Sequence, residues 1–194
     1  LFTPLSRVGS EVARHRDGNR FEKLATTPLS RLEWLLAQTI VNAAIIGVAA
    51  VLVLVAMSVL TGAEIVLSPL LAVFLAVAVA LFCGLGALIG SLADTQDGVI
   101  ATSNTIAIPL LFLSETFVPP TFLPEWFGPL LDLSPLTYFS RGVRAIVDPA
   151  TANVNGVVLA RWPTTADPVG NLVVLAVLAL IFFAVGAIAL PLAD

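Results

Sequence analysis

Residues 66–92 read VLSPLLAVFLAVAVALFCGLGALIGSL, and this stretch decides the fold class. It contains no charged side chain, and it is longer than the roughly 20 apolar residues that a helix needs to cross a bilayer. Three further apolar segments lie at about 34–60, 99–117 and 169–192. Because lipid offers no partner to an unpaired backbone N–H or C=O group, all four segments are predicted to be helices. We therefore expect an all-α integral membrane protein with four transmembrane helices.

The composition supports a membrane protein and argues against several other classes. Hydrophobic residues make up 58% of the chain and charged residues 11%, against roughly 25% charged residues in soluble domains. No basic tract with interleaved aromatic residues indicates a nucleic acid partner. His15 and Cys83 are the only residues of their types, so neither a metal site nor a catalytic site is predicted. The chain begins at Leu1 rather than Met, and we expect it to lack an N-terminal part.

Several of the predicted helices carry a start signal. Ser30 and Glu33 have the spacing of a capping box directly before the first apolar segment. Ser68 and Asp167 each precede a proline, which suits a capping residue followed by the first helical position.

The basic residues predict the orientation in the membrane. Six of the nine lie within residues 1–33, and the other three lie between the third and fourth spans. The positive-inside rule then places residues 1–33 in the cytoplasm. With four spans, region 118–168 is extracytoplasmic and the C-terminus, after the last span in 169–194, is cytoplasmic. Residues 123–133 are apolar but too short to span, which favours short interfacial or re-entrant helices in that region.

Small and polar residues inside the spans have two interpretations each. Gly84, Gly86 and Gly90 form a small-residue strip, for which close helix packing is favoured over a pore lining. The polar stretch 102–105 in the third span needs either a partner helix or a polar path. The N-terminal 33 residues are either a solvated juxtamembrane segment or a short amphipathic helix offered to a cytosolic partner.

Residues 16–30, RDGNRFEKLATTPLS, resemble the cytoplasmic coupling segment of type-2 ABC exporter permeases, the membrane subunits of ATP-binding-cassette exporters. Four positions fit the family pattern, whereas Asn19-Arg20 stands where Gly-Thr is commoner. The resemblance implies that the segment transmits motion from an ATPase. The residues expected to couple are Arg16, Phe21, Glu22, Leu24, Thr27 and Pro28.

Two later stretches resemble the same family. Residues 109–114, PLLFLS, are similar to its fifth span, with Glu115 where a glycine is more usual. Residues 133–139, LSPLTYF, with Arg144 after them, are similar to its Asn/Ser-Pro-Leu-Thr-Tyr signature. The family has six spans, so the four spans here would correspond to the third through sixth. The resemblance places Glu115, Tyr138 and Arg144 near an outer gate closed by re-entrant helices.

The sequence lacks the motif with which an ATPase subunit binds ATP. It has no phosphate-binding loop of the form G-x-x-x-x-G-K-[ST], so this chain is not expected to be an enzyme or to bind a cofactor. ATP and magnesium would be held by a partner ATPase, and the resemblance implies a second permease copy as well. We expect a multi-pass prokaryotic cell-membrane permease that exports its substrate. The alternative is a membrane scaffold or assembly protein that transports nothing.

Overall fold

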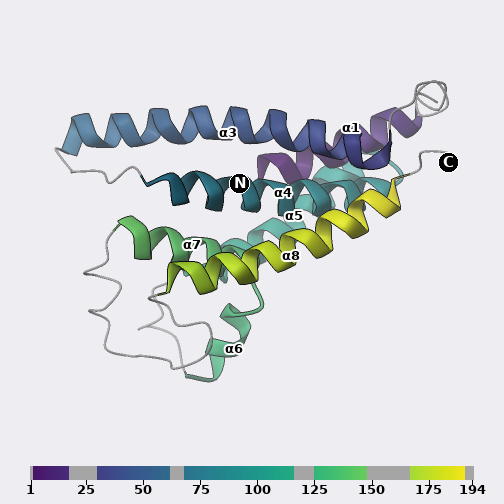
Figure 1. Cartoon of the computed structure of the whole chain (residues 1–194). Helices are drawn as coiled ribbons and strands as arrows, with labels where there is room; N and C mark the ends of the chain where they lie inside the picture. The colour runs from purple at the N-terminus through teal and green to yellow at the C-terminus, as the bar shows by residue number, and fades with distance from the viewer. Residues whose placement is uncertain (1, 18–29, 62–67, 116–124, 148–166, 191–194) are drawn as a thin grey trace. The chain divides into compact units, whose positions relative to one another are not determined.

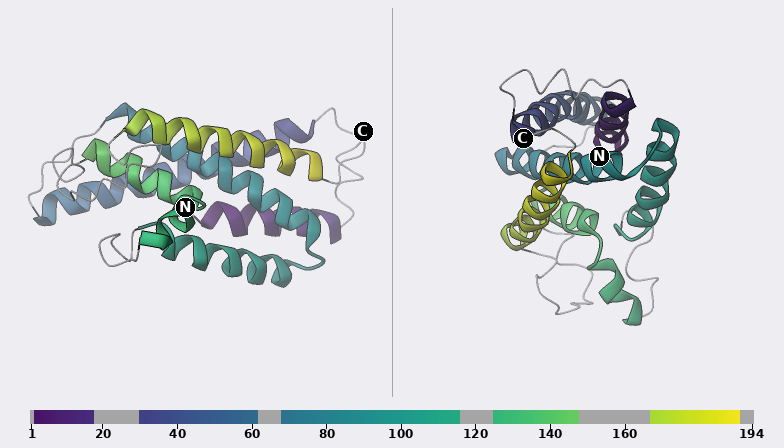
Figure 2. Two further views of the ribbon diagram at one scale, coloured as in Figure 1. Left: turned by 90° about the horizontal axis from the view of Figure 1, so that it is seen from below. Right: turned by 90° about the vertical axis from the view of Figure 1, so that its right-hand side faces the viewer.

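The structure is a computed structural model that describes residues 2–17, 30–61, 68–115, 125–147 and 167–190. Within these ranges the chain forms helices joined by turns, and no strand occurs, so the predicted all-α class is confirmed there (Figures 1 and 2). The α-helices are α1 (Thr3–Asp17), α3 (Arg31–Thr61), α4 (Pro69–Leu92), α5 (Gln96–Phe112), α6 (Gly128–Leu131), α7 (Pro135–Val147) and α8 (Pro168–Ala189), and Glu125–Phe127 is a short 3-10 helix, η2.

The predicted helix caps are confirmed. The Ser30 backbone N–H donates to Glu33 Oε2 at 2.8 Å, and the Glu33 backbone N–H donates to Ser30 Oγ at 3.2 Å, which is a reciprocal capping box. Ser68 Oγ and Asp167 Oδ1 each accept the backbone N–H two residues on, at 3.3 and 3.0 Å. The cap of α5 is Thr95, whose Oγ1 accepts a backbone N–H at 3.1 Å and which the sequence analysis had not singled out.

Helices α3 (over Arg31–Leu60), α4 and α8 are long and apolar enough to cross a membrane. Together with their composition they make this a multi-pass membrane protein. Helix α5 begins before the predicted 99–117 segment and ends at Phe112. Its 17 residues rise about 25 Å, which is short of the roughly 30 Å hydrocarbon layer. A fourth span therefore stays a prediction.

The chain forms two compact units. Unit 1 contains Leu1–Ile46, Val79–Ala107 and Leu178–Asp194, and unit 2 contains Gly47–Ala78 and Ile108–Val177. Helices α3, α4, α5 and α8 each contribute residues to both units. Each unit has its own candidate site, and the two are described separately below.

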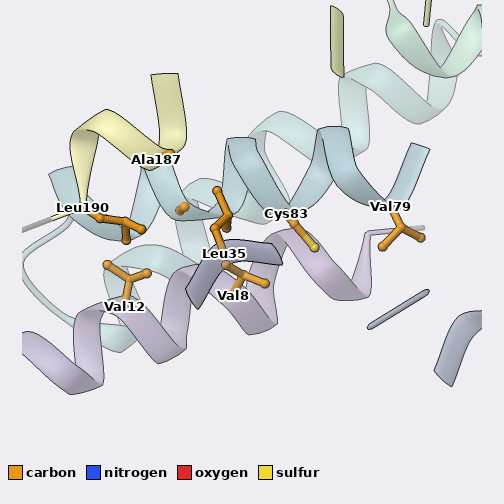
Figure 3. Packing of buried hydrophobic residues seen from close by; sticks show 8 residues of the cluster. Val8, Val12, Leu35, Val79, Cys83, Ala187 and Leu190 are labelled. Atoms are coloured by element: carbon orange, nitrogen blue, oxygen red, sulfur yellow. The ribbon is translucent and has the colours of Figure 1, made fainter. Parts of the chain in front are cut away.

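The core of unit 1 is built around one face of α1. Val8 and Val12 are fully buried; Val8 lies by Leu35 of α3 and Cys83 of α4, and Val12 faces Leu190 (Figure 3). Leu190, just after α8, belongs to the same cluster. The interpretation of the N-terminal segment as solvated is therefore wrong for α1. Its apolar residues looked sparse in sequence, but they recur at helical spacing and converge on one side of the helix.

Candidate functional site

Most of the predicted coupling residues lie outside the described part of the chain. These are Phe21, Glu22, Leu24, Thr27 and Pro28. Arg16 lies in the last turn of α1, but its side chain is not described. A coupling role for these six residues stays a prediction. The structure does describe the helix that leads into this segment and the contacts that hold that helix.

Helix α1 lies against the backbone of α4 at two glycines. A Cβ atom built on Gly86 would stand 2.5 Å from the carbonyl oxygen of Leu5 in α1. A Cβ atom on Gly90 would meet the backbone of Gly9, 2.8 Å from its Cα. Only a residue without a side chain allows the two backbones to approach so closely. Helices α1 and α4 are therefore in direct backbone contact at these two positions.

The third glycine of the predicted strip serves a different contact. A Cβ atom on Gly84 would stand 2.6 Å from the backbone of Phe182 and Phe183 in α8. Gly84 and Gly86 are two residues apart, which places them roughly 200° apart around the helix. The strip is thus two contacts on different faces of α4, one for α1 and one for α8.

Two polar or aromatic contacts also join the helix ends of unit 1. The ring of His15, near the end of α1, lies edge-on to the ring of Trp34 in α3, with centroids 6.0 Å apart. The Arg31 guanidinium, at the start of α3, donates to the carbonyl of Ile188 in α8 at 3.2 Å. The described helices of unit 1 are therefore connected at the end that adjoins the predicted coupling segment.

A polar groove of about 650 Å³ runs along α1 next to α5. Arg7 and Asn104 line it, and Arg14 and Glu11 form an ion pair at 3.4 Å on its wall. The remaining lining residues are Phe2, Thr3, Ser6 and Ser10. On α5 only one face is buried, through Val99, Ser103 and Ala107. The side chains of Thr102, Asn104 and Thr105 are exposed, beside the exposed apolar side chains of Ile100 and Ile108.

In unit 2 the structure brings together the residues predicted for an outer gate. The Arg144 guanidinium donates to the backbone carbonyl of Glu115 at 2.8 Å. The Tyr138 hydroxyl donates to the backbone carbonyl of Asp132 at 2.7 Å. Burial raises the pKa of Tyr138, and the neighbouring Asp132 charge adds to that effect, which keeps the phenol protonated. Whether this cluster forms a gate stays a prediction.

Arg141 is at the centre of this cluster, and the sequence analysis missed it. Its Nε donates to Glu115 Oε1 at 2.9 Å, its NH2 donates to the same oxygen, and its NH1 donates to Asp132 Oδ1 at 2.8 Å. Arg141 is 8% exposed and Glu115 is 4% exposed. Burial opposes the guanidinium charge, but the hydrogen bonds and charges of the two carboxylates outweigh it, so the pKa of Arg141 is raised.

Glu115 has a backbone conformation that favours glycine. Its φ is 58°, and it is the only non-glycine residue with positive φ in the described ranges. The resemblance to known permeases already indicated a glycine at this position. The structure shows why glycine suits it: the chain turns sharply after α5, and the left-handed conformation makes that turn.

One face of α7 caps the carbonyl end of α5. The hydroxyls of Ser134, Thr137 and Ser140 donate to the carbonyls of residues 110, 113 and 114, at 3.3, 2.8 and 2.7 Å. A helix leaves its last four carbonyls without partners inside the helix. Of the three carbonyls, that of Leu110 belongs to the last turn of α5, and the other two lie in the turn that follows the helix. Within the Ser-Pro-Leu-Thr-Tyr motif, Ser134 and Thr137 therefore donate to the end of α5 and the turn after it, whereas Tyr138 donates to Asp132.

The opposite side of α7 is apolar. The ring of Phe74, in the part of α4 that belongs to unit 2, occupies the space that a Cβ atom on Gly142 would need. The same ring lies edge-on to Phe139, with centroids 6.5 Å apart. Phe74 is fully buried. Helix α7 is therefore fixed on both sides, by polar contacts to α5 and by apolar contacts to α4.

Comparisons with known proteins identify the family of this chain. A family model described as ABC-2 type transporter matches residues 1–147. The chain is 31% identical over 61 residues to a protein from Streptomyces coeruleorubidus, the daunorubicin resistance ABC transporter permease protein DrrB1. That match covers 31% of this chain and 22% of the relative. No solved structure matches.

Proposed function

Because the chain belongs to the ABC-2 type transporter family, we propose that it exports substrate across the membrane, driven by ATP hydrolysis on a separate ATPase subunit. The observation that carries the proposal is the family match over residues 1–147, which makes this an ABC transporter membrane subunit. Three helices able to span the membrane are consistent with it. The ATPase partner and the outward direction of transport belong to the proposal.

The route of coupling follows from the packing of α1. The ATPase pushes on residues 16–28, which begin in the last turn of α1 and continue beyond it in the chain. Because α1 rests on the backbone of α4 at Gly86 and Gly90, a shift of α1 moves α4 with it. Side-chain contacts can absorb small displacements by changing rotamers, whereas contacts between backbones cannot. The glycine contact therefore makes α1 suitable as a lever.

The substrate path has a candidate surface in unit 1. The polar groove along α1 is flanked by Asn104, and the neighbouring side chains of Thr102 and Thr105 are exposed. If α5 is the predicted third span, these exposed polar groups are unfavourable against lipid, so a second permease copy or a polar path is expected to cover them. We propose that the groove faces the substrate path between two copies. The name of the relative mentions daunorubicin resistance, so daunorubicin is the first substrate to test.

Site-directed cross-linking tests the coupling role. Cys83 is replaced by Ala in the full-length protein, Phe21→Cys is introduced, and candidate ATPase subunits are tested in membranes with and without nucleotide. Leu60→Cys is the matched control, because Leu60 is 82% exposed but lies at the far end of α3, about 45 Å of helix from its start. We expect a nucleotide-sensitive adduct at Phe21→Cys and none at Leu60→Cys.

The same experiment separates the proposal from its alternative. A membrane scaffold needs no ATPase, so its juxtamembrane segment would give no nucleotide-sensitive adduct and would tolerate scrambling of residues 16–28. If every candidate ATPase fails to cross-link to a folded, inserted protein, the coupling model is wrong and the scaffold function is favoured.

A further inference from the structure

We propose that Arg141 is a positioning residue that fastens α7 to the end of α5, so that the two move as one rigid body during transport. We call these contacts the α5–α7 clasp. It consists of Glu115, Asp132, Arg141 and Arg144 together with Ser134, Thr137 and Ser140. The part played during transport rests on the proposed function, whereas the clasp itself rests on contacts within unit 2.

The charged side chains of the clasp are paired only when it is closed. Arg141 and Arg144 supply two positive charges, and Glu115 and Asp132 supply two negative charges. Arg141 and Glu115 are both more than nine-tenths buried. Separating them would leave two charges in a place that water reaches poorly, which is strongly unfavourable. Within the described residues, Arg141 forms the ion pair with the Glu115 carboxylate, whereas Arg144 bonds to the Glu115 backbone carbonyl.

The backbone of Glu115 points to a role for its side chain. A glycine would adopt φ 58° without strain, whereas a glutamate there costs energy that must be offset by other contacts. The side chain accepts two hydrogen bonds from Arg141, and the carbonyl accepts one from Arg144. The strained residue is thus held from both its side chain and its main chain, and α7 provides every one of these donors.

The clasp is built to stay closed rather than to open as a latch. Besides the ion pairs, three hydroxyls bond to backbone carbonyls at the end of α5. Opening would break all of these bonds together and would leave partly buried carbonyls without these partners. A latch that cycles at each turnover would instead be expected to use few contacts at an exposed site. The geometry therefore favours a permanent joint that carries motion of α5 to α7.

A cysteine pair across the clasp tests this directly. Ser140 Oγ donates to the backbone carbonyl of Ser114 at 2.7 Å, which makes residues 114 and 140 neighbours. Ser114→Cys with Ser140→Cys is therefore introduced into the full-length protein with Cys83→Ala; it removes one of the three hydroxyl donors and keeps the ion pairs. The protein is kept in membranes with its ATPase, and cross-linking by an oxidant or a short bifunctional thiol reagent is followed as thiols protected from alkylation. The two single-cysteine variants exclude links between copies.

We expect the cross-link to form at the same rate without nucleotide, with ATP, and with ATP and vanadate, and we expect it to leave ATP-dependent daunorubicin transport unchanged. A rate that falls several-fold in any of these states, or transport arrested by the cross-link, would show that the contact opens. Failure to cross-link in every state would contradict the contact itself. Either result would overturn the proposal.

Arg141 is tested in the same cross-linking background. We expect Arg141→Met to make the cross-linking rate depend on nucleotide and to abolish transport while ATP hydrolysis continues. Arg141→Lys keeps a positive charge. We expect it to restore part of the transport and to make the cross-linking rate less dependent on nucleotide. A purely structural role would lower the amount of folded protein without creating nucleotide dependence. If Arg141→Met does not fold, Glu115→Gln replaces it, because it removes the charge and keeps the shape.

The export proposal and the clasp proposal can be refuted independently of each other. If the unmodified protein binds no ATPase and transports nothing, the export proposal is wrong. The intramolecular cross-link between residues 114 and 140 can still be measured in that protein, and its dependence on Arg141 still decides whether the clasp exists.

Discussion

Adding one methyl group at Gly86 should separate α1 from α4. In Gly86→Ala the new Cβ atom would stand 2.5 Å from the carbonyl oxygen of Leu5 and 3.2 Å from its Cα. These are backbone atoms, so no rotamer change can relieve the contact and the whole of α1 must shift. Gly47→Ala in α3 is the matched control, because its Cβ atom would meet nothing within 4 Å.

Two effects of opposite sign set the size of the change. Overpacking of a closely packed site costs typically 1–3 kcal/mol, and a backbone contact belongs at the upper end, about 3 kcal/mol. Replacing glycine by alanine inside a helix contributes about 1 kcal/mol of stabilisation. Gly86→Ala is therefore expected to lose about 2 kcal/mol of folding free energy. Gly47→Ala is expected to gain up to about 1 kcal/mol.

The assay is thermal unfolding of the purified protein in one detergent, followed by tryptophan fluorescence. We expect Gly86→Ala to unfold at a lower temperature than the unmodified protein and Gly47→Ala at the same or a higher temperature. A second readout is the Phe21→Cys adduct with the ATPase, which should lose its nucleotide sensitivity in Gly86→Ala alone. If the two alanine variants unfold at the same temperature, α1 does not rest on the backbone of α4 and the lever is refuted.

Three further predictions concern the clasp and the helix caps. Arg141→Met should lose about 3–5 kcal/mol of folding free energy because it leaves the Glu115 carboxylate buried without a partner. Combining it with Glu115→Gln should recover part of that loss. Additive losses in a double-mutant cycle would contradict the ion pair. Thr137→Val keeps the side-chain shape but removes a hydroxyl whose single proton lies within reach of the carbonyls of Leu113 and Leu131, so it should lose about 1–3 kcal/mol by thermal unfolding. An unchanged midpoint would contradict this hydrogen bond. Ser30→Ala should lose about 1 kcal/mol through the cap of α3, with faster hydrogen exchange in the first turn of that helix; unchanged exchange would argue against the capping box.

The sequence predicted the parts of this protein that local physics controls. The apolar length of 66–92 required a membrane helix, because lipid leaves unpaired backbone groups without partners. The Ser30–Glu33 capping box formed as predicted, because both partners are three residues apart in the chain. The motifs around 16–30, 109–114 and 133–139 indicated the family, and the family model matches the region that contains all three.

Other features required the tertiary structure because they depend on residues that are distant in sequence. Nothing near α1 in the chain indicates that its valines would be buried against α4, or that Gly84 and Gly86 would serve different neighbours. Tyr138, Arg144 and Glu115 were found through motifs, but the bonds of Tyr138 to Asp132 and of Arg144 to the Glu115 carbonyl were not predicted.

Arg141 shows the difference most clearly. By itself it is one more basic residue in an amphipathic helix, with Glu115 lying 26 positions away. Local sequence patterns report on neighbours up to about four residues apart, since that is the reach of a helical turn. A buried ion pair between distant residues forms only after α5 and α7 have packed. The length and class of the helices could therefore be predicted from the sequence, whereas the packing of those helices decided which charges meet.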